Sequence, residues 1–210
     1  MSPRRIAIIG LGRMGWHMAA HLAKAGHVVS ACDVVPGVAE KWVDENGGSA
    51  FTDAAAAVVG CDIVVTSLPA DRELFAVADA ILPVLGNGSL WVDHSTTSAE
   101  GARVVHARAA ERNVAFLDAP VSGGVDGARN GTLTVMAGGD REAFDRAESV
   151  MSSYAARITL MGDSGAGQIT KMTNQICVVG LCQALAEGLD FAESAGLDVS
   201  KVIHVMLQGS

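Results

Sequence analysis

The chain has 210 residues with a net charge of −8, and half of its residues are apolar. This length fits one large domain, or one domain with part of another, and the apolar fraction is sufficient for a sizeable core. The acidic balance disfavours nucleic acid as a partner, because phosphate binding requires a basic surface, although local groups can still bind a small anion.

Cysteine usage and the N-terminal sequence favour a soluble, cytoplasmic protein. None of the four cysteines, Cys32, Cys61, Cys177 and Cys182, forms a CxxC pair or a zinc-ligand spacing. We therefore expect buried, reduced thiols and no metal site. No secretory signal sequence is apparent, and no apolar run reaches the roughly 18 residues that a membrane span needs.

Short apolar runs alternate with amphipathic segments through most of the chain. Taken in order, strand patterns occur at residues 6–9, 28–32, 62–67, 89–92, 114–117, 133–136 and 158–160. Helical periodicity lies between them at residues 14–25, 37–45, 74–85, 99–112 and 143–153. This alternation predicts a doubly wound α/β domain with a mostly parallel sheet covered on both faces.

The pattern changes after Gly165. From there to about Ala195 the chain has helical character without proline, and a second helix is predicted at residues 199–207. The first helix would span roughly 45 Å, too long to pack on one small sheet, so we expect it to connect two domains or to form a dimer contact. We predict one domain at residues 1–163, followed at 164–210 by this helix and the start of an all-α domain.

Residues 10–15 read GLGRMG, a GxGxxG pattern that follows the first strand and opens the first helix. Such glycines permit a tight turn and a close approach of the backbone to a pyrophosphate. Asp33 ends the second strand, where a carboxylate can accept hydrogen bonds from the adenosine ribose and would repel a 2′-phosphate. We therefore predict a Rossmann-type site for NAD rather than NADP; the alternative is a turn without a ligand and an Asp that caps a helix. The predicted contacts are Gly10, Leu11, Gly12, Arg13, Met14, Gly15 and Asp33.

Two further strand ends carry candidate cofactor contacts. Leu68 and Pro69 follow the strand at 62–67, and they either line the nicotinamide-ribose side of the site or form a plain turn. Ser95 and Thr96 follow the strand at 89–92. Because hydroxyls at the carboxyl end of a strand lie in the ligand crevice of an open α/β sheet, we expect both to contact the ligand.

The neighbours of Ser95 have competing interpretations. Thr97 and Ser98 could contact a ligand or simply cap the helix that follows. His94 could act as an acid–base group, but it has no visible partner in the sequence, and we expect a structural role.

Ser122, Gly123 and Gly124 follow another predicted strand. A hydroxyl with two bare backbone N–H groups can hold a carboxylate. The same residues can equally form a turn that needs positive φ angles at the glycines, so the two interpretations stay open.

Lys171 lies near the start of the long helix, and Asn174 follows three residues later, on the same helix face. An ammonium and a carboxamide side by side can hold and deprotonate one substrate hydroxyl. Burial and the positive end of the helix should lower the pKa of Lys171 and make it a better base. The alternative is a solvated lysine on an exposed helix.

With these segments in order, the chain resembles the β-hydroxyacid dehydrogenase family, which includes 3-hydroxyisobutyrate dehydrogenase, tartronate semialdehyde reductase and 6-phosphogluconate dehydrogenase. The motifs that carry the resemblance are GLGRMG at 10–15, DHSTTS at 93–98, DAPVSGG at 118–124, GTLTVMAGG at 131–139 and GAGQITKMTNQ at 165–175.

The resemblance implies hydride transfer between NAD and a small 3-hydroxy acid or its semialdehyde, similar to 3-hydroxyisobutyrate or to tartronate semialdehyde and glycerate. It implies that Lys171 is the general acid–base, and that Ser122, Gly123, Gly124 and Asn174 hold the substrate. The alternative is a non-catalytic cofactor-binding or interaction module of the same fold.

Two residues depart from the family pattern, and the chain is shorter than its members. His94 stands where a small residue is common, and Gln175 stands where many members have a second Asn. The Asn-Gln form is closer to what we expect of tartronate semialdehyde reductase-like members. Family members continue into a helical domain that supplies a further lysine and much of a dimer interface. We expect this chain to carry only the start of that domain and to form a homodimer or homotetramer.

Overall fold

Five parallel strands form the centre of the structure, a computed structural model that describes residues 3–209. They are β1 (Arg5–Ile9), β2 (Val28–Cys32), β4 (Ile63–Thr66), β5 (Leu90–Asp93) and β6 (Ala115–Asp118). Over the described residues the sheet has nine strands in the order β3-β2-β1-β4-β5-β6-β8-β7, with β9 paired to β8. The other four strands are β3 (Ser49–Phe51), β7 (Val121–Ser122), β8 (Leu133–Gly138) and β9 (Ala155–Gly162). Only β8 and its partners β6 and β7 pair in the antiparallel sense within this described sheet, so the predicted doubly wound, mostly parallel sheet is confirmed.

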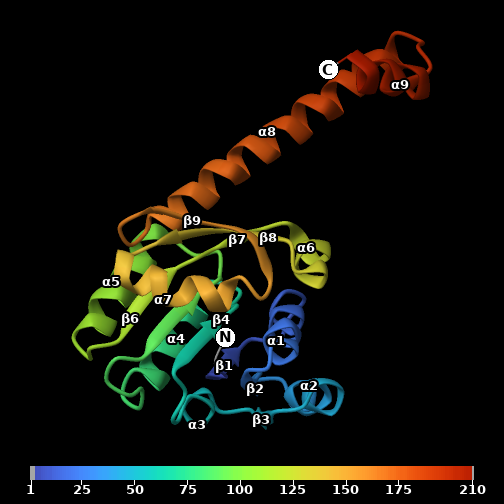
Figure 1. Cartoon of the computed structure of the whole chain (residues 1–210). Helices are drawn as coiled ribbons and strands as arrows, with labels where there is room; N and C mark the ends of the chain where they lie inside the picture. The colour runs from blue at the N-terminus through green and yellow to red at the C-terminus, as the bar shows by residue number, and fades with distance from the viewer. Residues whose placement is uncertain (1–2, 210) are drawn as a thin grey trace. The chain divides into compact units, whose positions relative to one another are not determined.

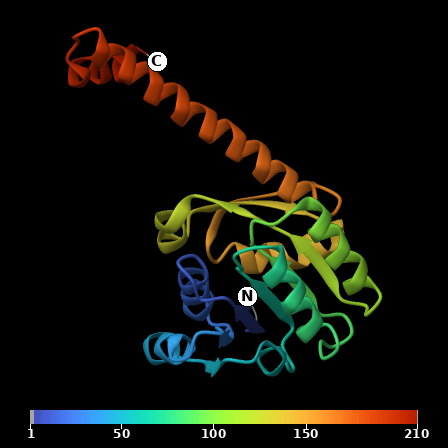
Figure 2. The same ribbon diagram turned by 180° about the vertical axis from the view of Figure 1, so that it is seen from behind.

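Helices cover both faces of this sheet (Figures 1 and 2). One face carries α1 (Gly15–Lys24), α2 (Val38–Asn46) and α7 (Arg141–Met151), and the other carries α3 (Ala54–Ala57), α4 (Asp71–Ile81) and α5 (Ala99–Ala110). Ile6 and Ile8 belong to one buried apolar cluster, whereas Ala7 and Ile9 belong to the other. Successive side chains of a strand point to opposite faces, so a strand that is covered on both sides must be apolar throughout.

One row of aligned residues crosses the sheet where its parallel strands end. It consists of Cys32, Ile9, Thr66, Asp93 and Asp118, each the last residue of its strand. The connecting loops that begin one residue later therefore start at the same edge of the sheet. In an open α/β sheet this is the edge at which ligands bind.

Four short elements were not predicted from the sequence. These are β3, α3, β7 and α6 (Gly124–Asn130). Two to four residues are too few to establish a strand or helix period. Helix α6 contains two glycines, which have low helix propensity, and it begins immediately after Gly123. The remaining predicted strands and helices are present with boundaries that shift by a few residues.

The chain divides into two compact units between Lys171 and Met172, a point inside α8 (Ala166–Ser194). The second unit contains the rest of α8 and α9 (Val199–Gly209). Both helices predicted for the C-terminal part are therefore present. Since α8 runs across the division, the domain boundary placed between residues 163 and 164 stays a prediction.

One expectation about the C-terminal part is wrong. Cys177 and Cys182 are exposed, whereas Cys32 and Cys61 are buried as expected. Helix α8 is also long and apolar enough, by length and composition alone, to cross a membrane. One such helix is weak evidence for a membrane span, because helices that pack in soluble proteins meet the same criterion.

Candidate active site

The three glycines of the loop between β1 and α1 differ in the space around them. A Cβ atom on Gly10 would overlap the carbonyl oxygen of Ser67, and one on Gly15 would overlap the carbonyl oxygen of Gly10. At Gly12, in contrast, a Cβ would meet nothing within 4 Å. Packing therefore explains the first and third glycines, and an open backbone at the second is suited to a bound pyrophosphate.

Asp33 connects the glycine loop after β1 to the loop after β2. Its Oδ2 accepts a hydrogen bond from the N–H of Leu11 (2.8 Å), and its Oδ1 accepts one from the N–H of Val35 (2.9 Å). The residues after it, Val34, Val35 and Pro36, are exposed and carry no positive charge. A carboxylate held in this way can accept ribose hydroxyls, and residues 34–36 supply no positive charge that would neutralise a phosphate.

Two cavities lie along this edge of the sheet. The Asp33 cavity has a volume of about 360 Å³, and its lining includes Gly12 and Asp33 together with apolar residues such as Val35 and Val77. The Lys171 cavity has a volume of about 350 Å³. Its lining consists of Met14, His94, Ser95, Thr96, Val121, Gly124, Lys171 and a shared wall, Ser67–Leu68–Pro69, that also lines the Asp33 cavity.

Part of the predicted cofactor and substrate set, including Gly12, Asp33, Gly124 and Lys171, thus lines these two neighbouring cavities. The two cavities share the wall Ser67–Leu68–Pro69, which connects the Asp33 side of this edge to the Lys171 side. Leu68 and Pro69 line both cavities, and their contact with a cofactor stays a prediction, whereas Arg13 is exposed and lines neither cavity. Ser67 and Val121 were not predicted; Ser67 could have been found as the first residue after β4.

Lys171 is the one cation that lines the Lys171 cavity among the residues the structure describes. Its side chain is half-buried, and this burial lowers the pKa of its ammonium below the ordinary value. A lower pKa makes the neutral amine more accessible near neutral pH, which a general base requires.

The hydroxyl of Ser95 is occupied by hydrogen bonds within the protein. Its Oγ donates to Asp93 Oδ1 (2.5 Å) and accepts from the N–H of Leu68 (2.8 Å). Thr66 Oγ1 donates to the same Asp93 oxygen (2.6 Å). Burial raises the pKa of Asp93, while these hydrogen bonds act in the opposite direction. Ser95 therefore fixes the shared wall, and its contact with a cofactor stays a prediction, as does that of the exposed Thr96.

Ser98 caps α5, which decides one of the alternatives left by the sequence. Its Oγ accepts a hydrogen bond from the N–H of Gly101 (2.9 Å) and donates one to Asp71 (2.5 Å). Thr97 makes no such cap; instead its N–H donates to Gln168 Oε1 (3.1 Å).

His94 is buried and has two hydrogen-bond partners. Its Nδ1 lies 2.6 Å from the carbonyl oxygen of Ala119, and its Nε2 lies 2.8 Å from the hydroxyl of Tyr154. A carbonyl can only accept, so Nδ1 carries the proton and Nε2 accepts from Tyr154. Burial lowers the pKa of His94 to about 4, and the imidazole is neutral at physiological pH. These contacts give His94 the structural role that we expected, in support of the Ala119 loop.

Gly123 and Gly124 adopt φ angles of +126° and +61°, so the turn interpretation of these residues is correct. The ligand interpretation also remains, because Gly124 lines the Lys171 cavity and a Cβ there would meet nothing within 4 Å. Ser122 is half-buried and does not line this cavity. Its contact with substrate, like that of Gly123, stays a prediction.

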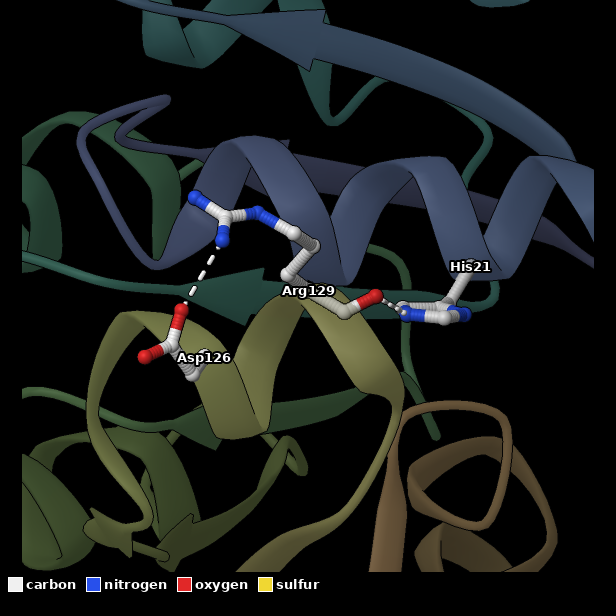
Figure 3. A network of polar contacts seen from close by, with 3 residues as sticks. All are labelled: His21, Asp126 and Arg129. Carbon is white, nitrogen blue, oxygen red and sulfur yellow. Dashed lines mark hydrogen bonds and ion pairs between the residues drawn. The ribbon is translucent and has the colours of Figure 1, made fainter.

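Helix α6, which begins at Gly124, is fastened at its other end to the cofactor helix α1 (Figure 3). His21 Nε2 lies 3.1 Å from the carbonyl oxygens of both Ala128 and Arg129. Arg129 also pairs with Asp126 at 2.8 Å. The C-terminal carbonyls of a helix lack partners within that helix, and a donor from α1 satisfies them. The segment after Ser122 is thereby held against the helix that follows the glycine loop.

Asn174 lies three residues beyond Lys171 along α8, in the second compact unit. Its Nδ2 donates to Oε1 of the neighbouring Gln175 at 3.3 Å. Its role toward a substrate stays a prediction.

Two family profiles match the chain. The profile described as the NAD binding domain of 6-phosphogluconate dehydrogenase matches residues 5–162. The profile described as the NAD-binding region of NADP-dependent 3-hydroxyisobutyrate dehydrogenase matches residues 165–210.

Individual proteins agree with these profiles. The chain is 38% identical to an NAD-dependent L-serine dehydrogenase of Pseudomonas aeruginosa, over 99% of this chain and 70% of that protein. It is 39% identical to a 3-hydroxyisobutyrate dehydrogenase of the same organism, over 98% of this chain and 70% of that protein. A solved structure of Mycobacterium tuberculosis 3-hydroxyisobutyrate dehydrogenase with L-serine is 37% identical, with a TM-score of 0.93 over 100% of this chain and 72% of that one.

We expect Gly12→Ala to leave the fold intact and to weaken nicotinamide dinucleotide binding by about 10-fold or more, because the added methyl occupies the space of the pyrophosphate. Gly86→Ala is a matched control, since its Cβ would meet only Ser89 Oγ, at 3.6 Å, at a distance from both cavities. Calorimetric titration and thermal unfolding measure the two effects. Unchanged affinity in Gly12→Ala would remove this loop from the cofactor site.

We compare the free energy of unfolding of the wild type with that of His94→Gln as a function of pH. As the pH drops from 6.5 to about 4, we expect the wild type to lose stability relative to the variant. Burial keeps the native imidazole neutral in this window, so the unfolded chain binds more protons and stability rises with pH. The full difference is roughly 3 kcal/mol, since one pKa unit corresponds to about 1.4 kcal/mol. Urea denaturation at both ends of the window measures it; contributions of Asp93 and Asp118 cancel because both proteins have them. A difference that does not vary with pH would contradict the assignment.

Proposed function

The chain belongs to the β-hydroxyacid dehydrogenase family, and we propose that it transfers a hydride between NAD and a small 3-hydroxy acid, with Lys171 as the general acid–base. The observation that carries this proposal is that the half-buried Lys171 lines a cavity that shares a wall with the Asp33 cavity. The family and its relatives support an NAD-linked hydroxy acid dehydrogenase.

We assign the steps of this reaction to Lys171 and Gly124, which line the Lys171 cavity, and to Ser122, Gly123 and Asn174, which follow or precede them in the sequence. The substrate carboxylate is held by Ser122 and by the backbone N–H groups of Gly123 and Gly124. The substrate hydroxyl meets Lys171 Nζ and the carboxamide of Asn174, one helical turn later. Neutral Lys171 takes the hydroxyl proton as the alcohol becomes a carbonyl, and in the reverse direction its ammonium returns that proton. A nicotinamide cofactor bound along the Asp33 cavity would supply the hydride acceptor for this step.

The substrate is drawn from acids that carry a hydroxyl on the carbon two positions from the carboxylate carbon. Such compounds include 3-hydroxyisobutyrate, glycerate and L-serine, and the relatives named above include a 3-hydroxyisobutyrate dehydrogenase and an L-serine dehydrogenase. The corresponding semialdehydes, such as tartronate semialdehyde, are the substrates of the reverse reaction. A neutral His94 in the lining suits an uncharged part of the substrate better than a second carboxylate.

NAD is the proposed cofactor, although the matched profiles and relatives name both NAD and NADP. The support comes from Asp33, whose carboxylate would face the 2′-phosphate of NADP without a nearby cation in residues 34–36. A cytoplasmic homodimer or homotetramer remains part of the proposal.

We expect Lys171→Ala to lose turnover by at least about 100-fold, the usual contribution of a general base, with NAD affinity close to normal. Lys171→Arg should be equally inactive, because a guanidinium keeps the charge but does not release its proton. Lys24→Ala, at an exposed position at the end of α1, is the matched control. The assay follows nicotinamide absorbance with 3-hydroxyisobutyrate, glycerate, 3-hydroxypropionate and L-serine. Turnover by Lys171→Ala near the wild-type rate would contradict the assignment, and silence of the wild type with every acid while NAD still binds would favour a non-catalytic module.

We expect kcat/KM with NAD to exceed that with NADP, and Asp33→Asn to reduce this ratio by about 10-fold, or 1.4 kcal/mol. The Asn retains one oxygen for the backbone N–H groups but loses the charge that repels a 2′-phosphate. Steady-state kinetics with both cofactors measures the ratio. An Asp33→Asn ratio equal to that of the wild type would show that this carboxylate does not select the cofactor.

A further inference from the structure

Asp118, the last residue of β6, is completely buried, and its carboxylate contacts the first turn of α8. Its Oδ1 accepts a hydrogen bond from the N–H of Gly165 (2.7 Å), and its Oδ2 accepts one from the N–H of Gln168 (3.0 Å). The first N–H groups of a helix lack partners within the helix, and a carboxylate is also favoured there by the helix dipole. Burial raises the pKa of Asp118 to about 6, so it is mostly ionised at neutral pH.

Gln168 connects the same turn of α8 to the loop after β5. Its side chain is also completely buried. The Nε2 donates to the carbonyl oxygen of Ser95 (2.8 Å), and the Oε1 accepts from the N–H of Thr97 (3.1 Å). One glutamine therefore holds both sides of Thr96, which lines the Lys171 cavity.

The backbone of this turn lies directly on the ends of β6 and β8. A Cβ on Gly167 would lie 2.6 Å from the carbonyl oxygen of Asp118 and would overlap that of Met136. A Cβ on Gly138, the last residue of β8, would lie 2.8 Å from the N–H nitrogen of Gly167. The turn has little room to shift in this direction without a collision between backbone atoms.

We propose that Asp118 and Gln168 are positioning residues that fix the backbone of Lys171 at the edge of the sheet where the parallel strands end. This inference rests on the function proposed above. Lys171 follows Gln168 by three residues, less than one turn, so the position of its Cα is set by the anchored turn. A lysine has a flexible four-carbon stem, and it can hold its amine at one place only if that stem starts from a fixed point.

The anchor also determines how deeply the ammonium is buried. Asp118 places a negative charge at the N-terminal end of α8, which offsets the positive helix end that we expected to act on Lys171. Burial is accordingly the cause of the lowered pKa of Lys171. The other titratable side chain that lines the cavity among the described residues is His94, which is neutral, while Asp93 and Asp118 lie buried behind the lining. A loosened anchor should therefore let the ammonium move toward water.

Two variants remove the anchor one part at a time. Asp118→Asn replaces one accepting oxygen by an NH₂ group, so one of the two helix N–H groups loses its acceptor. Gln168→Met removes both side-chain hydrogen bonds, to Thr97 and to Ser95, without a change of charge, and it serves if the first variant does not fold. Asp62→Asn is the matched control, because Asp62 accepts a backbone hydrogen bond from the N–H of Arg5 (3.0 Å) at the opposite edge of the sheet.

The first measurement needs no substrate. The chain has four lysines, and reductive ¹³C-methylation gives each one a resonance whose titration reports its pKa. Lys171→Arg assigns the resonance of Lys171, and Lys24, Lys41 and Lys201 are internal references. We expect the Lys171 midpoint to rise toward its ordinary value in Gln168→Met and to stay unchanged in Asp62→Asn. In Asp118→Asn the loss of a negative charge acts in the opposite direction, so turnover is the readout for that variant.

The second measurement is turnover of unmodified protein with the best acid of the panel. We expect kcat to fall by about 10- to 100-fold in the anchor variants, as for a small displacement of a reacting group, with NAD affinity unchanged. A folded variant in which neither the Lys171 midpoint nor kcat changes would overturn the inference. If the wild type has no activity at all, the proposed function fails, while the Lys171 midpoint still decides whether the anchor fixes this side chain.

Discussion

The register of the parallel sheet is the constraint on which the site depends. Ile9, Thr66, Asp93 and Asp118 are aligned across neighbouring strands, and each is the last residue of its strand. The residues that follow them begin the glycine loop, the shared wall, the His94 segment and the Ala119 loop. Because side chains alternate between the faces of a strand, a slip of one residue in any pair would turn the polar row into an apolar face and displace one of these loops.

The polar members of this row need partners because they are buried. Thr66, Asp93 and Asp118 have no exposed surface. Asp93 accepts from Thr66 within the sheet and from Ser95 just beyond it, and Asp118 accepts from the N–H groups at the start of α8. An unpaired buried carboxylate would be strongly unfavourable, so each one fixes the groups that donate to it. Asp93 in this way fixes Ser95, and Asp118 fixes the start of α8. The order of the ligand edge thus comes from hydrogen bonds to polar side chains that the sheet has placed inside.

Much of the architecture could be predicted from the sequence because its signals are local. The GxGxxG pattern, the apolar runs and the position of Asp33 each depend on a few consecutive residues. The roles of Asp118 and Gln168 could not be predicted, since they depend on contacts between residues about 50 and 70 positions apart in sequence, such as Asp118 with Gln168 and Gln168 with Ser95. Both stand inside motifs that the resemblance identified, but a motif does not show which of its residues face inward. The exposed Cys177 and Cys182 were misplaced for a similar reason, since a general tendency of thiols to be buried says nothing about a particular helix face.

The shared wall also bears on how specificity can change in this protein. Ser67, Leu68 and Pro69 line both cavities, so a substitution there alters the surroundings of cofactor and substrate at once. Val121 and Gly124 line the Lys171 cavity alone. Selection for a new acid can therefore act on the Val121 side without loss of cofactor affinity, whereas changes in the wall would require compensation elsewhere. Under the proposed function, substrate preference can change at Val121 and Gly124 independently of the cofactor, whereas a change at the shared wall affects both ligands.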